Sequence, residues 1–316
     1  MTDEIKPPRI AVILPCYNEE AAIGKTVRDF RAALPDAKVY VYDNNSKDRT
    51  VEVAREAGAI VRNEPRQGKG NVMRRMFADV EADIYVLADG DDTYDASVAP
   101  ELIRKLVTEE LDLVTGRRIH TAADAYRAGH VLGNKMLTGL TALMFGIELK
   151  DMLSGYRIMS RRFVKSFPFT AEGFGIETEL TVHAVRLLMP MAEVDTAYKE
   201  RPPGSVSKLS TYRDGFKILF TIAHLIREER PLFFFSTVAA VLAVVAGALA
   251  YPLLIEFLHT HLVPRLPTAL LATALVIIAF LSVMSGFILD TVTRGRWESK
   301  RMAYLSFRGP QDRRNS

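Results

Sequence analysis

Short apolar runs alternate with amphipathic segments along the first two thirds of the chain. Each run is rich in β-branched or aromatic residues and ends at turn-forming residues, which is typical of buried strands. We expect strands at 9–14, 39–42, 59–61, 84–87 and 111–114. The segments 20–33, 97–107 and 174–188 instead place apolar residues at helical spacing. Strands that alternate with helices predict an α/β domain with a parallel, helix-covered sheet, which we assign to residues 1–213.

The pattern changes near the C-terminus, where two long apolar runs carry no charged residue. The runs 232–254 and 266–289 are each longer than the ~20 residues that cross a bilayer core. We therefore expect two transmembrane helices within 231–290, with a pair of buried helices in a soluble protein as the alternative. The preceding segment, 214–230, is amphipathic and is expected to lie on the membrane surface as an interfacial helix.

The charges around these runs predict their orientation. Arginine and lysine flank the apolar pair, whereas the connecting loop 256–265 contains one arginine and no lysine. The flanking cations are Arg227, Arg230, Arg294, Arg296, Lys300 and Arg301. Because positively charged loops stay on the cytoplasmic side, we expect the α/β domain, both termini and the tail 291–316 to face the cytoplasm. Small residues along both runs permit association with a second copy of the chain.

The overall composition adds two constraints. The net charge is only +3, so the composition gives no sign of a nucleic-acid partner. Cys16 is the only cysteine, which rules out an internal disulfide and fits a reducing compartment, where we expect it to be a small packed residue. The charged N-terminus lacks the apolar core of a signal peptide.

The strand expected at 84–87 leads into an acidic stretch. Residues 85–95 read YVLADGDDTYD, with four aspartates within seven positions. Carboxylates this close repel one another unless a cation lies among them, so a hard divalent metal is expected there. In an α/β domain the ligand crevice lies beyond the carboxyl ends of the strands, which is where this stretch falls. A solvated acidic loop, or a helix N-cap at Asp95, is the structural alternative.

Two other nucleotide-binding motifs are incomplete. The tripeptide GKT at 24–26 resembles the end of a P-loop, but Glu19 stands where that motif needs glycine. The tripeptide GKG at 68–70 lacks the third glycine of a dinucleotide fingerprint and does not directly follow a strand. Neither a P-loop ATPase nor a Rossmann dehydrogenase is supported.

The order of the motifs resembles the family 2 glycosyltransferases, whose catalytic domain has the GT-A fold. The resemblance is carried by PCYNEE, VYDNNSKDRT, RQGKGNVMRRMF and ADGDD, in this order. The later segments VTGRR, DMLSGYRIMSRRF and ERPPGSVSKL are similar to the polyprenyl-phosphate glycosyltransferases, a group that includes dolichyl-phosphate mannose synthase. The resemblance covers roughly residues 9–213 and implies an α/β GT-A domain followed by membrane helices.

The resemblance implies contacts with a sugar nucleotide. Asp43 would accept hydrogen bonds from the base, Glu19 would contact the base or ribose, and Lys69 would meet a phosphate. The structural alternatives are an Asx cap for Asp43, a first-turn helix acid for Glu19 and a plain turn at Lys69. The same motifs imply substrate contacts for Pro15, Tyr17, Asn45, Gly90 and Ser154.

The resemblance also implies a metal site in the acidic stretch. Asp89 and Asp91 match the D-x-D motif, whose carboxylates would hold Mg²⁺ or Mn²⁺ against the donor diphosphate. Close relatives often have Gln or Ser two positions after the second Asp. This chain has Thr93 there, preceded by an extra acid, Asp92, so the hydroxyl of Thr93 is the third ligand expected.

A set of cations at motif positions suits a reaction between two phosphate-bearing substrates. Arg117 and Arg118 follow the strand expected at 111–114 and would face the crevice, with Arg117 assigned a catalytic role beside the two aspartates. Arg157, Arg201 and Lys208 add positive charge in the later motifs. Guanidinium forks match phosphate oxygens, although a solvated surface position is the commoner fate of any one such residue.

The expected function is inverting transfer of a hexose from a nucleotide sugar to a polyprenyl phosphate, undecaprenyl or dolichyl, at the cytoplasmic membrane face. The acidic turn favours a UDP-sugar, with GDP-mannose as the alternative. A processive polysaccharide synthase is disfavoured because Thr293 replaces the Gln of its Q-x-x-R-W motif. A non-catalytic membrane scaffold is the remaining alternative. Glu177 and Glu179, near the start of the helix at 174–188, suit either the helix dipole or a catalytic role.

Overall fold

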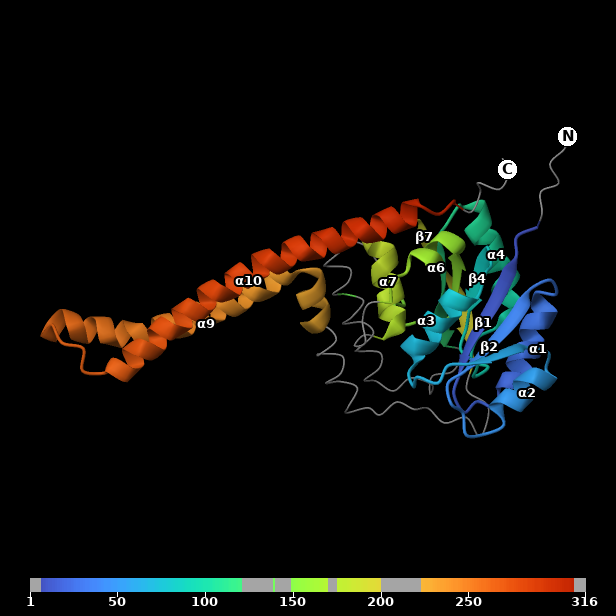
Figure 1. The fold of residues 1–316 in the computed structure, drawn as a ribbon, viewed down its shortest axis with the longest axis horizontal. Helices are drawn as coiled ribbons and strands as arrows, with labels where there is room; N and C mark the ends of the chain where they lie inside the picture. The colour runs from blue at the N-terminus through green and yellow to red at the C-terminus, as the bar shows by residue number, and fades with distance from the viewer. Residues whose placement is uncertain (1–6, 121–138, 140–148, 170–174, 200–222, 310–316) are drawn as a thin grey trace. The chain divides into compact units, whose positions relative to one another are not determined.

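The computed structural model describes residues 7–120, 139, 149–169, 175–199 and 223–309 (Figure 1). The chain divides into two compact units, one made of Met1–Ile218 with Lys300–Ser316 and the other of Leu219–Ser299. Two expected site residues, Arg201 and Lys208, lie outside the described residues. Of the expected interfacial helix, only the part from residue 223 onward is described, and residues 223–229 are helical.

The first unit is built around a seven-stranded sheet with the strand order β3-β2-β1-β4-β6-β5-β7. Its strands are β1 (Ile10–Cys16), β2 (Lys38–Asp43), β3 (Ile60–Asn63), β4 (Ile84–Leu87), β5 (Leu113–His120), β6 (Arg157–Ser160) and β7 (Met191–Tyr198). The pairs β3-β2, β2-β1, β1-β4 and β5-β7 are parallel. The expected strands are therefore all present, and β6 and β7 are additions that the sequence pattern did not predict.

The expectation of an entirely parallel sheet was wrong at β6. This strand runs antiparallel to both of its neighbours, with Leu87 opposite Arg157 at one end and Ile84 opposite Ser160 at the other. The chain thus enters β6 at the level where β4 ends. A parallel strand would have required a crossover that first returned the chain to the opposite edge of the sheet. The sheet is mixed, with helices on both faces.

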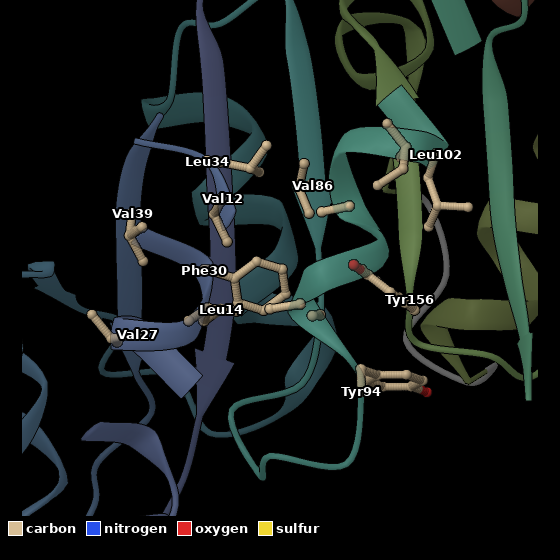
Figure 2. Packing of buried hydrophobic residues seen from close by; sticks show 14 of the residues in the cluster. Val12, Leu14, Val27, Phe30, Leu34, Val39, Val86, Tyr94, Leu102 and Tyr156 are labelled. Atoms are coloured by element: carbon tan, nitrogen blue, oxygen red, sulfur yellow. The ribbon is translucent and has the colours of Figure 1, made fainter. Parts of the chain in front are cut away.

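Helices cover the sheet as the sequence predicted. On one face, α1 (Ile23–Ala33) contacts α2 (Thr50–Glu56), α4 (Ala99–Thr108) and the short helix η1 (Ala96–Val98). On the other, α3 (Lys69–Asp79) contacts α6 (Arg161–Ser166) and α7 (Ile176–Arg186) (Figure 1). The hydrophobic core on the first face joins Val12 and Leu14 of β1 to Phe30, Leu102 and Tyr156 (Figure 2). All five side chains are fully buried or nearly so, and their burial fixes the frame that carries the loops.

Two strands extend past their expected ends, and both extensions matter for the site. β1 continues through Pro15 to Cys16, with these residues opposite Tyr42 and Asp43 of β2. Cys16 is buried, as expected for a packed residue. β5 continues to His120, so Arg117 and Arg118 lie within this strand rather than in a loop after it. Successive side chains of a strand point to opposite faces, which separates the two arginines.

The second unit contains two long apolar helices, α9 (Pro231–Thr260) and α10 (Leu266–Leu305). Both are long and apolar enough to cross a membrane. The buried residues of α10, which are Ala272, Ala279, Gly286 and Thr293, recur every seven positions. At Gly286 the two helices approach so closely that an added Cβ would lie 3.3 Å from Cα of Leu232. Small residues therefore form the contact between the helices, as is common for helices in lipid.

The end of α10 belongs to the first unit. The helix continues well past the apolar run that ends at 289. The hydroxyl of Tyr304 donates a hydrogen bond to Oδ2 of Asp112 at 2.8 Å, and the guanidinium of Arg162 lies 4.9 Å from the centre of the Tyr304 ring. Arg161 lies over Phe307 in a similar way, at 5.6 Å. The last turn of α10 is thus packed against residues that flank β5 and begin α6.

Candidate active site

The acidic turn, residues 89–95, follows β4 at the carboxyl end of the sheet. Its shape depends on a close approach at Gly90, where an added Cβ would lie 2.4 Å from Sγ of Cys16. Gly90 is not among the described glycines with positive φ, so what requires glycine here is room for the thiol. The residue with positive φ is Asp92, at 58°. Its side chain leaves the turn and pairs with Nζ of Lys25 at 2.9 Å.

The two aspartates of the D-x-D motif have different surroundings. Asp91 is buried, and its Oδ1 accepts hydrogen bonds from the hydroxyl of Thr93 at 2.6 Å and from the Thr93 N–H at 3.3 Å. Asp89 has a partly exposed side chain, and its Oδ1 lies 2.6 Å from Nζ of Lys69. Thr93 thus orients the carboxylate of Asp91, whereas the ammonium of Lys69 contacts the carboxylate of Asp89.

The donor set fits a hard divalent cation. Among the residues that the structure describes, no group of three acidic, histidine or cysteine side chains could hold a metal ion. The site would therefore offer two carboxylates, Asp89 and Asp91, with the Thr93 hydroxyl beside them. Mg²⁺ typically takes one or two carboxylates and completes its octahedron with water and substrate phosphates, so this set is sufficient. All of the protein donors are oxygen atoms, which Mg²⁺ and Mn²⁺ prefer.

Lys69 joins three parts of the site. It is the first residue of α3, directly after Gly68, whose φ of 126° is accessible to glycine. Its Nζ lies 2.6 Å from Oε1 of Glu177 as well as 2.6 Å from Oδ1 of Asp89. Burial opposes a charge on Lys69, but the two carboxylates outweigh this effect and raise its pKa. Burial likewise opposes the charge on Glu177, and the Lys69 ammonium overcomes it and lowers the pKa of that carboxyl.

The loops after β1 and β2 are tied to each other. The N–H of Asn18 donates to Oγ of Ser46, and the N–H of Glu19 donates to Oγ1 of Thr50, both at 2.8 Å. Asp43 is buried and accepts a hydrogen bond from the Ser46 N–H at 3.1 Å, which is the Asx contact of the structural alternative. The structure thus brings Glu19 and Asp43 to adjoining loops at the same edge of the sheet. Pro15 ends β1 beside them, and Tyr17 is half-buried in the first loop.

Asn44 organises the loop that leads to Lys69. Its amide donates to the carbonyls of Glu64 and Arg66, at 2.9 and 2.8 Å, and its Oδ1 accepts from the Gly68 N–H at 2.7 Å. The neighbouring Asn45, the residue expected to contact substrate, donates to the carbonyl of Pro65. A run of polar residues does not show which of them is buried, so the position of Asn44 could not be predicted from the sequence.

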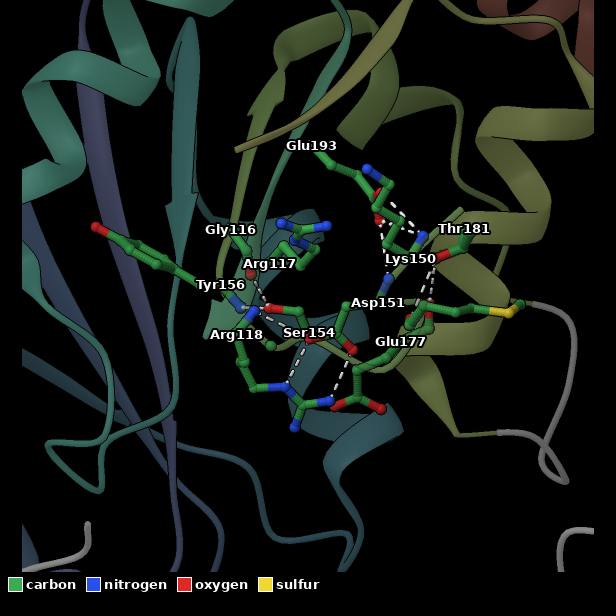
Figure 3. Close-up of polar contacts among 12 residues, drawn as sticks. Gly116, Arg117, Arg118, Lys150, Asp151, Ser154, Tyr156, Glu177, Thr181 and Glu193 are labelled. Carbon is green, nitrogen blue, oxygen red and sulfur yellow. Dashed lines mark hydrogen bonds and ion pairs between the residues drawn. The ribbon is translucent and has the colours of Figure 1, made fainter. Parts of the chain in front are cut away.

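The two arginines of β5 lie on opposite faces of the sheet, as shown in Figure 3. Arg118 makes a two-pronged ion pair with Asp151, at 2.8 and 2.7 Å, and its guanidinium lies 5.6 Å from the centre of the Tyr198 ring. Arg117 pairs with Asp195 of β7, directly opposite it in the strand register. Tyr198 forms an isolated bridge with Tyr94 of the acidic turn, and the next N–H, that of Lys199, donates to the carbonyl of Thr93 at 2.8 Å, so Arg118 is the arginine on the side of the acidic turn.

Arg157 and Ser154 hold the backbone of the site. Arg157 is fully buried and donates to the carbonyls of Met152, Ser154 and Glu177 and to Oγ1 of Thr181. Burial lowers the pKa of this guanidinium to about 10. Ser154 donates to the carbonyl of Gly116 at 2.5 Å (Figure 3). The substrate contacts expected of both residues stay predictions, and the contacts seen connect α7, β5 and the loop before β6.

Several contacts that shape the site were not predicted from the sequence. Asp151 pairs with Arg118, Glu177 pairs with Lys69, and Tyr94 accepts a hydrogen bond from the Gly155 N–H at 2.8 Å. Glu177 and Lys69 are 108 positions apart, so no local pattern could have joined them. Asp151 does lie in the D-M-L-S-G-Y-R motif, whose expected site residues are Ser154 and Arg157.

Comparison with known proteins identifies the family. The model of Glycosyl transferase family 2 matches residues 11–167. Glycosyltransferase AglJ of Haloferax volcanii is 34% identical over 234 residues, covering 73% of this chain and 77% of that protein. This chain belongs to glycosyl transferase family 2. The resemblance inferred from the motifs is thus confirmed, and the chain is a glycosyltransferase.

Two further similarities bear on its chemistry. A dolichyl-phosphate hexose transferase of Haloferax volcanii is 29% identical, covering 70% of this chain and 95% of that protein. Glucosyl-3-phosphoglycerate synthase from Mycobacterium tuberculosis, crystallised with Mn²⁺, UDP and glucosyl-3-phosphoglycerate, is 26% identical, with a TM-score of 0.54. It covers 69% of this chain and 79% of its own. The GT-A fold is therefore shown, and a divalent metal is consistent with this neighbour.

Proposed function

We propose that this glycosyltransferase transfers a hexose from a UDP-sugar to a polyprenyl phosphate, with inversion at the anomeric carbon. The observation that carries the proposal is the meeting of Asp89, Asp91 and Lys69 at the carboxyl end of the sheet, beside the tied loops that contain Glu19 and Asp43. This arrangement suits a nucleoside diphosphate. The similarity to a dolichyl-phosphate hexose transferase supports the lipid acceptor, and the UDP-bound neighbour supports the donor.

Each residue of the site has its own role in binding the donor. Glu19 and Asp43 bind the nucleoside, and Thr93 keeps the buried Asp91 carboxylate oriented toward the diphosphate. Asp89 and Asp91 would hold a divalent cation, which would supply positive charge for the leaving diphosphate. Lys69 adds an ammonium that can follow the departing oxygens. These groups lower the barrier because they stabilise charge that grows as the bond to the sugar breaks.

The acceptor needs little help from a protein base. A phosphate monoester has its second pKa near ~6 and is largely a dianion at neutral pH. One of its oxygens attacks the anomeric carbon as the bond between that carbon and the diphosphate oxygen breaks, so no proton is transferred. His183, the one described histidine in the core of the catalytic unit, is buried between Phe163 and Phe167. It belongs to the packing rather than to the reaction.

The lipid substrate explains the membrane helices. A polyprenyl phosphate presents its headgroup at the bilayer surface, and α9 and α10 are apolar and long enough to hold the chain in that bilayer. Arg118 is our candidate for binding the acceptor phosphate, since its guanidinium lies over Tyr198, which pairs with Tyr94 of the acidic turn. Arg201 would assist it. The flanking cations favour a cytoplasmic catalytic unit.

The proposal is tested with full-length protein purified in detergent, Mn²⁺, labelled nucleotide sugars and a short polyprenyl phosphate. We expect a labelled lipid product from a UDP-hexose, and an Asp91→Asn variant should lose about a hundredfold or more in turnover, as when a group that stabilises the transition state is removed. Asp92→Asn, the same change one position later, should retain turnover because Asp92 pairs with Lys25 instead.

Three outcomes would contradict the proposal. Equal turnover of the Asp91→Asn variant would refute the metal assignment. Product from GDP-mannose alone would replace the donor. Transfer to glycerol phosphates but not to a polyprenyl phosphate would refute the acceptor. Thermal protection by each nucleotide, measured with and without Mn²⁺, reports donor choice independently of transfer.

A further inference from the structure

Lys69 contacts a carboxylate, that of Asp89, which a metal ion at the proposed site would also bind. Its ammonium lies 2.6 Å from Oδ1 of Asp89, one of the two carboxylates of the D-x-D motif. The second partner, Oε1 of Glu177 at the start of α7, is also 2.6 Å away. Both contacts are short, charge-assisted hydrogen bonds. The side chains of Lys69, Asp89 and Glu177 are 37%, 30% and 18% exposed, so the cluster is partly open to solvent.

The ammonium and a divalent cation cannot share the Asp89 carboxylate at close range. Two positive charges this close repel each other in a site that is only partly open to solvent, and the second charge on the metal doubles this repulsion. Asp89 has only one carboxylate to offer, and its Oδ2 lies against Gly155, where an added Cβ would approach to 2.6 Å. When a metal binds, Lys69 therefore has to leave Asp89.

Glu177 gives the displaced ammonium a place to stay. It comes from a separate helix, and its carboxylate contacts the same ammonium as Asp89 does. A lysine that loses one of two carboxylates keeps half of its charge pairing, whereas a lysine with a single partner would lose all of it. The four-carbon side chain of Lys69 is flexible enough to pivot about such a contact.

We propose that Lys69 is a built-in counter-ion that occupies Asp89 in the donor-free enzyme and yields it to the metal, and that Glu177 is the positioning residue that retains Lys69. The inference rests on the proposed metal site at Asp89 and Asp91. In the empty site the ammonium neutralises the acidic turn, which would otherwise carry unbalanced charge. After metal binding, Glu177 keeps the ammonium beside the diphosphate, where it is needed as the leaving group departs.

The inference predicts opposite effects for the two partners on metal affinity. Lys69→Gln removes the competitor, so Mn²⁺ should bind the donor-free enzyme roughly tenfold more tightly, as expected for a competing charge. Glu177→Gln leaves Lys69 with Asp89 alone, so Mn²⁺ should bind several-fold more weakly. In the double variant, the effect of Glu177→Gln should largely vanish because there is no lysine to retain. Such non-additivity is the signature of residues that act through one another.

The experiment measures Mn²⁺ binding by electron paramagnetic resonance and calorimetry, with full-length protein in detergent and no sugar nucleotide. Lys25→Gln is the matched control, since Lys25 contacts the same acidic turn through Asp92 but does not contact Asp89. We expect it to change Mn²⁺ affinity less than twofold. Protection of the buried Cys16 thiol from labelling shows that each variant is folded.

The outcomes separate this inference from the proposed function. If Asp91→Asn does not weaken Mn²⁺ binding, the metal site itself is wrong. If Asp91→Asn abolishes binding but Lys69→Gln leaves it unchanged or weaker, the counter-ion role is refuted. Equal tightening by Lys25→Gln would show a general charge effect and refute it too. A Glu177→Gln effect that persists undiminished in the Lys69→Gln background would make Glu177 a metal ligand rather than a positioning residue.

Discussion

Asp89 and Asp112 lie at opposite ends of the catalytic sheet and have different kinds of partners. Asp89 lies beyond the carboxyl end of β4, partly exposed, and its contact is one lysine that another carboxylate shares. Asp112 lies just before β5, at the other end, and is completely buried. It accepts hydrogen bonds from Ser160 at 2.6 Å, Arg162 at 2.5 Å and Tyr304 at 2.8 Å. The partners of Asp89 are open to solvent, whereas the carboxylate of Asp112 is enclosed by its donors.

The difference shows how one fold separates stability from chemistry. A buried carboxylate is tolerated only when donors surround it, so the partners of Asp112 are fixed by structure. At the acidic turn, solvent access keeps the cost of losing a partner low, and contacts can change during the reaction. Substitutions at Asp112 should therefore change mainly the stability, and those at the acidic turn mainly the metal affinity.

Asp112→Ala should destabilise the protein by about 3 kcal/mol, because it removes a fully buried carboxylate that accepts from Ser160, Arg162 and Tyr304. The free energy of unfolding can be followed by labelling of Cys16, which is buried in the native state. Mn²⁺ affinity of the remaining folded protein should be unchanged. Asp89→Ala is the matched change at the other end, and it should alter Mn²⁺ affinity with little cost in stability. The contrast fails if the two variants lose the same stability.

Gly90→Ala should destabilise the acidic turn by roughly 2 kcal/mol, within the range for overpacked cores. The added methyl would meet the Cys16 sulfur at 2.4 Å. A second change, Cys16→Ala, removes that sulfur, so the double variant should recover much of the stability and Mn²⁺ affinity lost by Gly90→Ala. Circular dichroism replaces thiol labelling in this pair. No recovery would mean that the clash with Cys16 is not what requires glycine.

Acid should lower the free energy of unfolding of the catalytic unit through His183. Burial, with a smaller contribution from the Lys300 charge, lowers the pKa of His183 from 6.5 to about 3. Between these values the unfolded chain binds a proton that the folded chain does not, so stability falls as pH drops below 6.5. The loss at pH 5.5 should be about 1.4 kcal/mol.

A His183→Leu variant supplies the control, since it keeps the apolar surroundings and cannot titrate. The chain has six histidines, and the difference between the two proteins isolates this one. Unfolding free energies measured from pH 8 to 5.5 should diverge as the pH falls, with the unmodified protein losing more. Parallel curves would show that His183 binds its proton equally well in the folded and the unfolded chain.

Tyr304→Phe should have the smallest effect, about 1 kcal/mol, because it removes a single hydrogen bond to Asp112 and keeps the ring under Arg162. Thiol labelling of Cys16 again measures the stability. Tyr251→Phe is the control, since Tyr251 is an exposed residue of α9. A cost above that of Asp112→Ala would mean that the hydroxyl has a role beyond this contact.

The sequence predicted the parts of the fold whose signals are local. The apolar runs at 9–14, 39–42, 59–61 and 84–87 are continuous and end at turn residues, so the strands and the ligand edge followed. β6 has only two apolar residues, between an arginine and a serine, and β7 is half-exposed along most of its length, so neither stood out. The antiparallel direction of β6 depends on the path of the preceding chain, which no local pattern records.

The candidate site divides in the same way. The acidic turn, Lys69 and the loops with Glu19 and Asp43 come from motifs next to strands, and the structure places them at one edge of the sheet. The pairings of Lys69 with Glu177 and Arg118 with Asp151 join distant segments. The two arginines were expected to act together because β5 was expected to end before them. Their separation follows from the alternation of side chains along a longer strand.

The sevenfold spacing of Ala272, Ala279, Gly286 and Thr293 has a geometric consequence. Seven residues fall short of two full turns of a straight α-helix, so a stripe that keeps this repeat drifts around the axis unless the helices bend. A left-handed supercoil of the helical pair removes the drift. Replacing Ala279 with isoleucine would wedge this coil open at its middle, while the same replacement one position later would change only the surface offered to lipid.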